Sequence, residues 1–158
     1  MDHIAEEFGK HFNMDEVTMI LTAEASGIAL SAIVAHHFHK PMIFAKKAKS
    51  DNIEGGLYQS DIFSYTYKKK VTLLVSKEWL SSDDKVLVID DFMANGEAMR
   101  GLCDIVTAAG ATLVGIGCAV EKGFQGGGDR LRAAGVNLKS LAIIESAEPG
   151  NIVFRDDD

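Results

Sequence analysis

Helical spacing of apolar residues and continuous apolar runs alternate along the chain. The helical pattern occurs near the N-terminus (4–12), in Gly27–Phe38 and in Glu97–Ala109. The continuous runs, which are typical of strands buried on both faces, are Val17–Thr22, Met42–Ala45, Val86–Ile89, Thr112–Val120 and Leu138–Ile144. Strands that alternate with helices in this way predict an α/β domain with a central, mainly parallel sheet flanked by helices.

The segment between residues 46 and 75 has a different pattern. Alternating apolar and polar residues in Asp61–Tyr67 and in Val71–Val75 predict an antiparallel hairpin. The stretch before it, Lys46–Ser60, is polar and contains glycines, which predicts a long mobile loop. Nearer the C-terminus, a short helix is expected at about Asp129–Ala134.

Composition places these elements in one globular domain. The chain has 158 residues, of which 47% are hydrophobic, and this is enough for a sizeable core. We therefore expect a single domain over residues 1–158, with a frayed acidic tail at 155–158. The formal net charge of −7 disfavours bulk binding to nucleic acid. No apolar run approaches a membrane span and no signal peptide opens the chain, so we expect no membrane partner and a cytoplasmic location.

The most informative stretch is VLVIDDFMANGEAMRG, in which an apolar run is followed by two carboxylates and a small-residue loop. In sheets of this class, ligands bind outside the carboxyl ends of the strands. That rule is expected to bring three loops together: Ala23–Gly27, Asp90–Gly96 and Glu121–Gln125. Two adjacent like charges at such a place are costly unless something binds there.

The residues of this stretch suit a phosphorylated sugar. Asp90 and Asp91 can accept hydrogen bonds from a vicinal diol or hold a divalent cation. The segment Ala94–Ala98 carries no cation, so backbone N–H groups would have to bind any phosphate, with Gly96 and the following helix N-terminus supplying them. Together these features predict a ribose 5-phosphate site. The alternative is an exposed acidic turn that caps a helix.

The same stretch resembles the phosphoribosyl pyrophosphate (PRPP) signature of the type I phosphoribosyltransferases. The segments TAEASGIA, FAKKAKS, SYTYKKK, GIGCAVEKGFQ and SLAIIES also resemble, in order, the corresponding parts of the bacterial members that act on xanthine. The resemblance extends almost without gaps from about Val17 to Phe154. It implies the type I phosphoribosyltransferase fold, a homodimer, and Mg²⁺ bound together with PRPP rather than in a metal site of the protein alone.

The resemblance also assigns roles to individual residues. It implies that Asp90 and Asp91 hold the ribose hydroxyls of PRPP. The 5-phosphate would be wrapped by Ala94, Asn95, Gly96, Glu97 and Ala98, and the pyrophosphate received by Glu24, Ala25, Ser26 and Gly27. The flexible loop that closes over the reacting centre would begin with Lys46, Lys47, Lys49 and Ser50. The candidate catalytic residues are Asp90, Asp91 and Lys46.

Lys122 is the residue expected to select the base. In the family, the lysine of this loop lies beside the purine, and an ammonium group only donates hydrogen bonds, so it suits a 6-oxo acceptor. Phe124 or Phe92 could stack on the base, although a surface lysine and core aromatics are the ordinary alternatives. Ala94 stands where some 6-oxopurine enzymes have an acidic base. Xanthine ionises readily and would need no strong base. The resemblance implies purine salvage, in which PRPP and a 6-oxopurine, xanthine first, give the nucleoside monophosphate (XMP for xanthine) and pyrophosphate.

Two departures from the family leave alternatives open. Family members have an N-terminal segment that covers the base, and this sequence is expected to lack it. Glu97 stands where relatives carry glutamine, and we expect its carboxylate to point outward. The alternatives are a non-catalytic PRPP-binding regulator of the purine-repressor type, or a truncated PRPP-binding protein with altered or lost base specificity. The histidines of HHFH (36–39) are expected at the surface or an interface, not around zinc.

Overall fold

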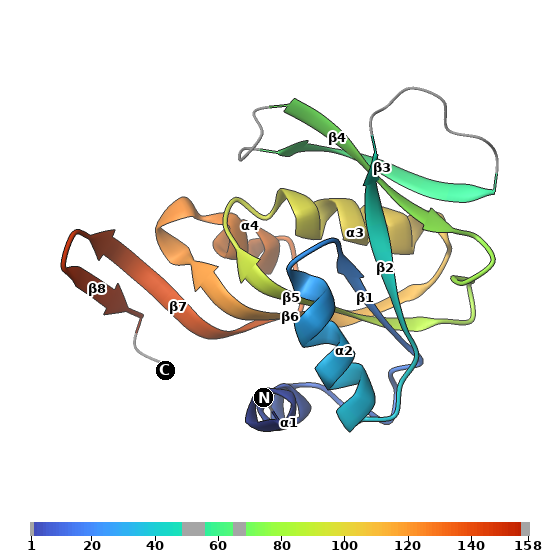
Figure 1. Cartoon of the computed structure of the whole chain (residues 1–158), viewed down its shortest axis with the longest axis horizontal. Coiled ribbons are helices and arrows are strands. Elements are labelled where there is room, and N and C mark those ends of the chain that lie inside the picture. The colour runs from blue at the N-terminus through green and yellow to red at the C-terminus, as the bar shows by residue number, and fades with distance from the viewer. Residues whose placement is uncertain (1, 49–55, 65–68, 156–158) are drawn as a thin grey trace.

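The centre of the molecule is an eight-stranded sheet with the strand order β3-β4-β2-β1-β5-β6-β7-β8 (Figure 1). The structure is a computed structural model that describes residues 2–48, 56–64 and 69–155. The strands are β1 Met19–Ala23, β2 Met42–Ala48, β3 Leu57–Ser64, β4 Lys69–Ser76, β5 Lys85–Met93, β6 Thr112–Lys122, β7 Leu138–Glu148 and β8 Asn151–Phe154. The pairs among β2, β1, β5, β6 and β7 are parallel, whereas β3, β4 and β8 pair antiparallel. The predicted α/β class is therefore confirmed.

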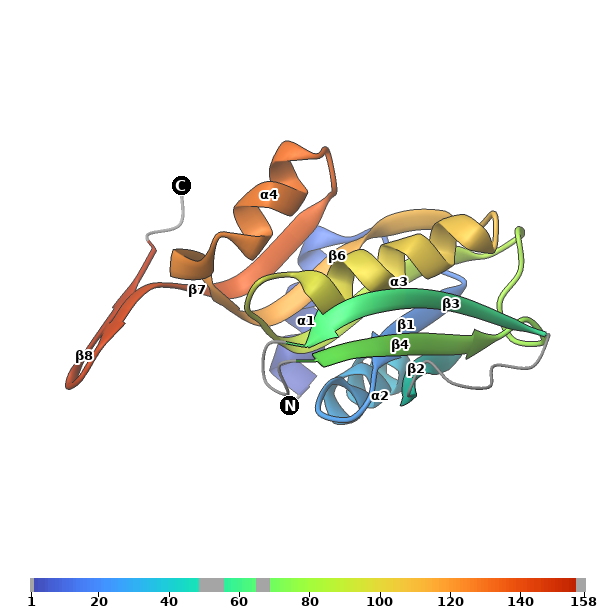
Figure 2. The same cartoon turned by 90° about the horizontal axis from the view of Figure 1, so that it is seen from above.

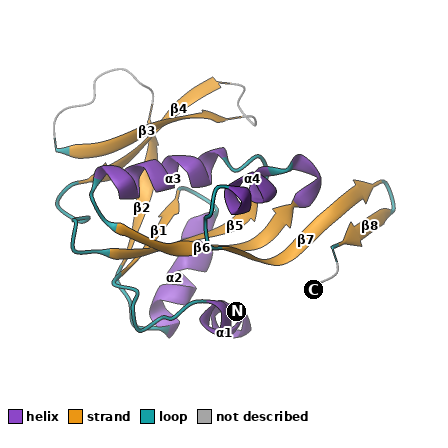
Figure 3. Ribbon diagram, turned by 180° about the vertical axis from the view of Figure 1, so that it is seen from behind, coloured by secondary structure: helices purple, strands orange, loops and turns teal. Residues whose placement is uncertain are grey.

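Helices cover both faces of the sheet (Figure 3). One face carries α1 (Asp2–His11) and α2 (Gly27–His37), and the other carries α3 (Glu97–Ala108) and α4 (Gly127–Ala133). A short 3₁₀-helix, η1 (Gly123–Gln125), precedes α4. No helix in the described ranges is both long and apolar enough to cross a membrane.

Strand β5 shows why a continuous apolar run forms the middle of such a sheet. Its side chains alternate between the two faces, as they do in any strand. Val86 and Val88 pack in the core on the α3 side, and Leu87 and Ile89 pack in the core on the α1–α2 side. All four are fully buried, so an apolar residue is needed at every position.

The predicted end of this strand was wrong. Strand β5 does not stop at Ile89 but continues through Met93, with Phe92 paired to Val120 and Met93 paired to Glu121 of β6. The long neighbouring strand supplies backbone partners beyond the apolar run, so polar residues remain in the ladder. As a result, Asp90 and Asp91 lie within a strand and not in a loop.

The predicted loop Lys46–Ser60 was also too long. Strand β2 continues through Ala48, because residues 46–48 pair with β4, and β3 already begins at Leu57. The β3–β4 hairpin itself is confirmed (Figure 2). Lys49 and Ser50, expected to belong to the flexible loop, lie outside the described residues.

The last hairpin was not predicted. Strand β7 continues past Ile144 to Glu148 and turns back into β8, which pairs with it antiparallel. Figure 2 shows this hairpin extending away from the body of the molecule. The side chains of β8 are exposed, so no buried apolar alternation marks it in the sequence.

Candidate active site

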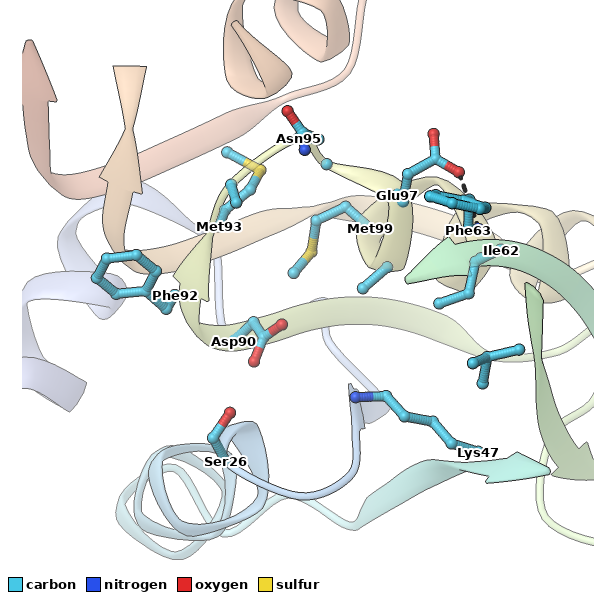
Figure 4. A pocket seen from close by; sticks show the side chains of 14 residues that line it. Ser26, Lys47, Ile62, Phe63, Asp90, Phe92, Met93, Asn95, Glu97 and Met99 are labelled. Atoms are coloured by element: carbon cyan, nitrogen blue, oxygen red, sulfur yellow. Dashed lines mark hydrogen bonds between the residues drawn. The ribbon is translucent and has the colours of Figure 1, made fainter. Parts of the chain in front are cut away.

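A cavity of about 260 Å³ lies at the carboxyl end of β5, between the start of α2, strand β2 and the start of α3 (Figure 4). Its lining residues are Ser26, Lys47, Ile62, Phe63, Val71, Asp90, Phe92, Met93, Ala94, Asn95, Gly96, Glu97, Ala98 and Met99. The cavity thus contains the whole predicted 5-phosphate segment, one member of the predicted pyrophosphate loop, and one of the two adjacent carboxylates.

Asp90 and Asp91 occupy different environments although they are neighbours. Asp90 is 7% exposed and lines the cavity, and Asp91 donates its backbone N–H to Asp90 Oδ1 at 2.9 Å. Burial, followed by the neighbouring Asp91 carboxyl, raises the pKa of Asp90 to about 7. The carboxylate of Asp91 instead accepts a hydrogen bond from Ser26 Oγ at 2.9 Å. Asp91 is therefore tied to the predicted pyrophosphate loop by this hydrogen bond.

Gly27 allows this loop to approach the acidic strand. A Cβ atom added at Gly27 would lie 2.3 Å from Thr22 Oγ1 and 2.4 Å from Asp90 Oδ1. A residue with a side chain would therefore displace Asp90. The peptide between Glu24 and Ala25 is cis, and the Glu24 carboxylate accepts the backbone N–H of Lys47 at 2.5 Å. The loop is thereby attached to strand β2 as well.

The two lysines at the end of β2 point to opposite sides because they are adjacent in a strand. Lys47 lines the cavity, and Figure 4 shows its amine directed toward Asp90. Its positive charge lowers the pKa of Asp90, which opposes part of the effect of burial. Lys46 lines a separate apolar groove together with Phe44 and Trp79. The structure thus brings Lys47, and not the predicted Lys46, to the carboxylates.

The predicted phosphate loop is shaped by glycines on two elements. Gly96 has a φ of 77° where it precedes α3, a left-handed conformation that favours glycine. Gly127, at the start of α4, packs on the loop so closely that an added Cβ would lie 2.4 Å from the carbonyl oxygen of Ala94. The sequence of the loop alone could not indicate this second glycine, because it lies about thirty residues further along the chain.

The Glu97 side chain is one-third exposed and is directed toward the end of β3 (Figure 4). Its Oε2 accepts hydrogen bonds from the backbone N–H of Phe63 at 3.4 Å and from the Arg100 guanidinium at 3.3 Å (Figure 4). Arg100 offsets the charge of Glu97, so the carboxylate can lie beside a phosphate loop with less repulsion.

Of the residues predicted to bind the purine, Phe92 lines the cavity and Lys122 contacts Phe92. The Lys122 ammonium is 5.0 Å from the centroid of the Phe92 ring, a cation–π distance, and Phe92 itself lines the cavity. Phe124 is half-exposed on η1. Lys122 and Phe124 are not among the lining residues of the cavity, and Lys122 is connected to it through the Phe92 ring.

A buried carboxylate that the sequence did not reveal holds α4 in place. Glu121 is fully buried at the end of β6, and its carboxylate accepts hydrogen bonds from the Arg132 guanidinium at 2.6 and 3.1 Å. Ser140 of β7 donates to the same carboxylate at 2.5 Å. A buried charge requires such partners, and only the fold reveals them, because Arg132 and Ser140 lie on other elements.

A divalent cation has two adjacent carboxylates available here, but no larger protein cage. Within the described ranges, no cluster of three or more histidine, cysteine or acidic side chains could hold a metal ion. Mg²⁺ is commonly bound by one or two carboxylates together with substrate phosphates. Asp90 and Asp91 fit a cation that arrives with a phosphorylated ligand.

The chain matches the family model for the phosphoribosyl transferase domain over residues 1–136. It is 51% identical to the xanthine phosphoribosyltransferase of Bifidobacterium animalis subsp. lactis, covering 98% of this chain and 81% of that protein. It is 48% identical to the xanthine phosphoribosyltransferase of Alkaliphilus metalliredigens, covering 99% and 78%.

Solved structures of other family members share the fold. The adenine phosphoribosyltransferase of Giardia lamblia, complexed with 9-deazaadenine, superposes with a TM-score of 0.79 at 24% identity, covering 92% of this chain and 80% of that one. The adenine phosphoribosyltransferase of Rhodothermus marinus superposes with a TM-score of 0.77 at 21% identity, covering 90% and 78%. The chain belongs to the phosphoribosyltransferase family and has its type I fold.

Proposed function

We propose that this protein is a purine-salvage pentosyltransferase that transfers the phosphoribosyl group of PRPP to xanthine, giving XMP and pyrophosphate. The observation that carries the proposal is about 50% identity to xanthine phosphoribosyltransferases over nearly the whole chain. The cavity supports the proposal, because its lining combines a carboxylate, a lysine and a loop without a cationic side chain at a helix N-terminus. The domain would comprise residues 1–158, and the location would be cytoplasmic.

PRPP would bind across the cavity with its ribose over the acidic pair. The carboxylates of Asp90 and Asp91 would accept hydrogen bonds from the ribose hydroxyls. The backbone N–H groups of residues 94–98 and the N-terminus of α3 would hold the 5-phosphate. The loop of residues 24–27 would receive the pyrophosphate, since Ser26 already contacts Asp91.

The reaction breaks the bond between C1 of the ribose and the pyrophosphate oxygen, and forms a bond from C1 to a purine nitrogen. Positive charge develops at C1 and negative charge on the departing pyrophosphate. Lys47 would balance the departing charge, because its amine points into the cavity toward Asp90. Mg²⁺, carried in with PRPP and held in part by Asp90 and Asp91, would neutralise the pyrophosphate further. Ala94 offers no base, so the purine would react as its anion.

The base would lie at the Phe92 side of the cavity. Phe92 is exposed enough to stack on a purine, and Phe124 could contact its other face. Lys122 would donate a hydrogen bond to a 6-oxo group, since it already lies against the Phe92 ring. A 6-oxopurine would therefore bind better than adenine, whose 6-amino group does not accept from an ammonium.

One assay distinguishes this function from its alternatives. The protein is incubated with PRPP, Mg²⁺ and, separately, xanthine, guanine, hypoxanthine or adenine, and pyrophosphate release is measured. We expect release with xanthine above all. Saturable PRPP binding without pyrophosphate release with any base would instead favour a PRPP-sensing regulator. Release that does not favour xanthine would favour a PRPP-binding protein of altered base specificity.

We also propose that the protein is a homodimer in solution. The support is the exposed β8 strand, in which Ile152, Val153 and Phe154 are 59%, 43% and 57% exposed. An apolar edge strand of this kind is a surface that proteins usually cover.

A further inference from the structure

Arg130 lies outside the cavity but contacts the loop that forms one of its walls. Its guanidinium donates a hydrogen bond to the carbonyl oxygen of Asn95 at 3.1 Å. A second guanidinium nitrogen lies 3.5 Å from the carbonyl oxygen of Gln125, in the loop beside the predicted purine residues. Arg130 is exposed on α4. One cationic side chain therefore contacts the backbone of both substrate loops.

The bond to Asn95 constrains the direction of a particular amide. The Asn95 carbonyl and the Gly96 N–H belong to one planar trans peptide, so they point in opposite directions. Arg130 holds the carbonyl on the α4 side, which turns the N–H away from α4. Asn95 and Gly96 both line the cavity. The guanidinium thus favours the orientation in which this N–H can donate to a bound anion.

Gly127 packs closely against the same peptide, between Asn95 and Gly96. An added Cβ at Gly127 would lie 2.6 Å from the carbonyl carbon of Asn95 and 2.7 Å from the amide nitrogen of Gly96. The peptide is therefore packed against α4 and also hydrogen-bonded to it. The helix itself is held by the ion pair between Arg132 and the buried Glu121, so it provides a support for the loop.

The contacts of Arg130 differ from those that anchor α4. Among the described residues, the ion pairs of α4 are made by Arg132 and Asp129, and Arg130 makes none. An exposed side chain with hydrogen bonds to two carbonyls contributes little to stability. Its contacts are concentrated on the substrate loops, which indicates a role in binding.

We propose that Arg130 is a positioning residue for the 5-phosphate loop, which holds the Asn95–Gly96 peptide so that its N–H faces the phosphate of PRPP. This inference rests on the proposed function, because it takes PRPP as the ligand. The longer contact to Gln125 would transmit a smaller effect to the base.

The test compares Arg130→Ala and Arg130→Lys with the wild type. Lys139→Ala is the control, since it removes a positive charge from an exposed position on β7. The measurements are KM for PRPP and for xanthine, kcat, the melting temperature, and the Kd of ribose 5-phosphate by calorimetry. For Arg130→Ala we expect KM for PRPP and Kd to rise about tenfold, because a hydrogen bond that orients a charge-binding amide is lost. The melting temperature should stay close to that of the wild type.

Arg130→Lys separates positioning from charge. A lysine keeps the charge but not the planar fork that reaches two carbonyls, so we expect most of the loss to remain. If Arg130→Lys bound PRPP as tightly as the wild type, the effect would be one of charge alone and the proposal would be overturned. The same holds if Lys139→Ala lost as much PRPP affinity as Arg130→Ala. Wild-type affinity in Arg130→Ala would also overturn it, as would a loss matched by a large fall in melting temperature.

The binding measurement keeps this proposal distinct from the proposed function. A wild type that binds ribose 5-phosphate but releases no pyrophosphate would defeat the transfer reaction, and the Kd values of the variants would still decide the role of Arg130. A wild type that releases pyrophosphate with xanthine but does not bind ribose 5-phosphate would leave the transfer reaction standing, and KM for PRPP in the variants would then decide the role of Arg130.

Discussion

At the scale of single residues, Asp90 is a carboxyl group whose surroundings favour its neutral form. Its pKa is raised from 3.8 to about 7, chiefly by burial. The folded protein therefore holds this proton more tightly than the unfolded chain does. The stability that results is complete below pH 3.8 and is lost progressively as the pH rises to 7, at about 1.4 kcal/mol per pH unit.

Asp90→Asn removes this titration and tests it. We expect the variant to gain stability relative to the wild type as the pH rises from 5 to 7, with little further change above pH 8. The measurement is the free energy of unfolding from urea titrations of both proteins at each pH. Other titrating groups are shared and cancel in the difference. A difference that stays constant from pH 5 to pH 8 would contradict the raised pKa.

Lys46 and Lys47 form a matched pair, because they have the same charge and adjacent positions but opposite directions. We expect Lys47→Ala to lower kcat about 100-fold, since a charge that faces the departing pyrophosphate is lost. Lys46→Ala should have a much smaller effect, because Lys46 lines the groove with Phe44 and Trp79. Steady-state kinetics with PRPP and xanthine decide between them. The reverse order of effects would restore the catalytic role that the sequence predicts for Lys46.

Lys122 should affect the base and not PRPP. In Lys122→Ala the donor to the 6-oxo group is lost, so KM for xanthine should rise about tenfold. The Kd of PRPP, measured without a base, should be unchanged, because Lys122 does not line the cavity. If PRPP affinity fell as much as xanthine affinity, Lys122 would have a different role.

The sequence predicted which residue types lie in the site better than it predicted their directions. The acidic pair and Gly96 could be recognised from local chemistry and from the resemblance to a family. The direction of Lys47 could not be recognised in this way, because the polar stretch after Ala45 predicted a loop. Side chains in a loop have no fixed alternation. Continuing the strand by three residues would have given the correct face.

At the scale of elements, α4 supports the phosphate loop, and Gly127 leaves no room for a side chain between the two. An alanine there would meet backbone atoms, which cannot rotate away as a side chain can. We expect Gly127→Ala to weaken PRPP binding at least about tenfold, because the loop must move by a large fraction of a bond length. The Kd of PRPP or ribose 5-phosphate, by calorimetry, is the measurement.

Gly135→Ala is the matched control for this change. Gly135 has a φ of 85° and no atom within 4 Å of an added Cβ. The substitution should therefore cost about 1 kcal/mol of stability through backbone strain and leave PRPP affinity unchanged. Equal loss of affinity in both variants would show that the effect of Gly127→Ala is not local.

The elements that were predicted least well are those defined by partners distant in sequence. The buried strands and long helices follow from apolar periodicity, so their existence was predicted correctly. The extension of β5 through Asp90 depends on β6, and the extension of β2 depends on β4. Strand β8 has exposed apolar residues and no buried face, so local pattern could not identify it.

At the scale of the whole molecule, the β7–β8 hairpin extends away from the body and ends in the exposed apolar residues of β8 (Figure 2). We expect the wild type to have about twice the 17.1 kDa mass of one chain in sedimentation equilibrium, with this hairpin at the interface. A charge at its centre should disrupt the contact, because an unpaired charge buried in an interface is costly. Ile152→Lys should therefore shift the mass toward that of a monomer.

Trp79→Glu provides the comparison, because Trp79 is also a large exposed apolar residue, 64% exposed, but lies on the groove beside β2 and β4. We expect this variant to remain dimeric. A monomeric Trp79→Glu with a dimeric Ile152→Lys would place the interface at the groove instead. Because the groove contains Lys46, the end of β2 and its neighbour Lys47 would then lie close to the partner, and dimer dissociation should reduce activity. With the interface at β8, monomeric Ile152→Lys should keep the cavity intact and retain PRPP binding.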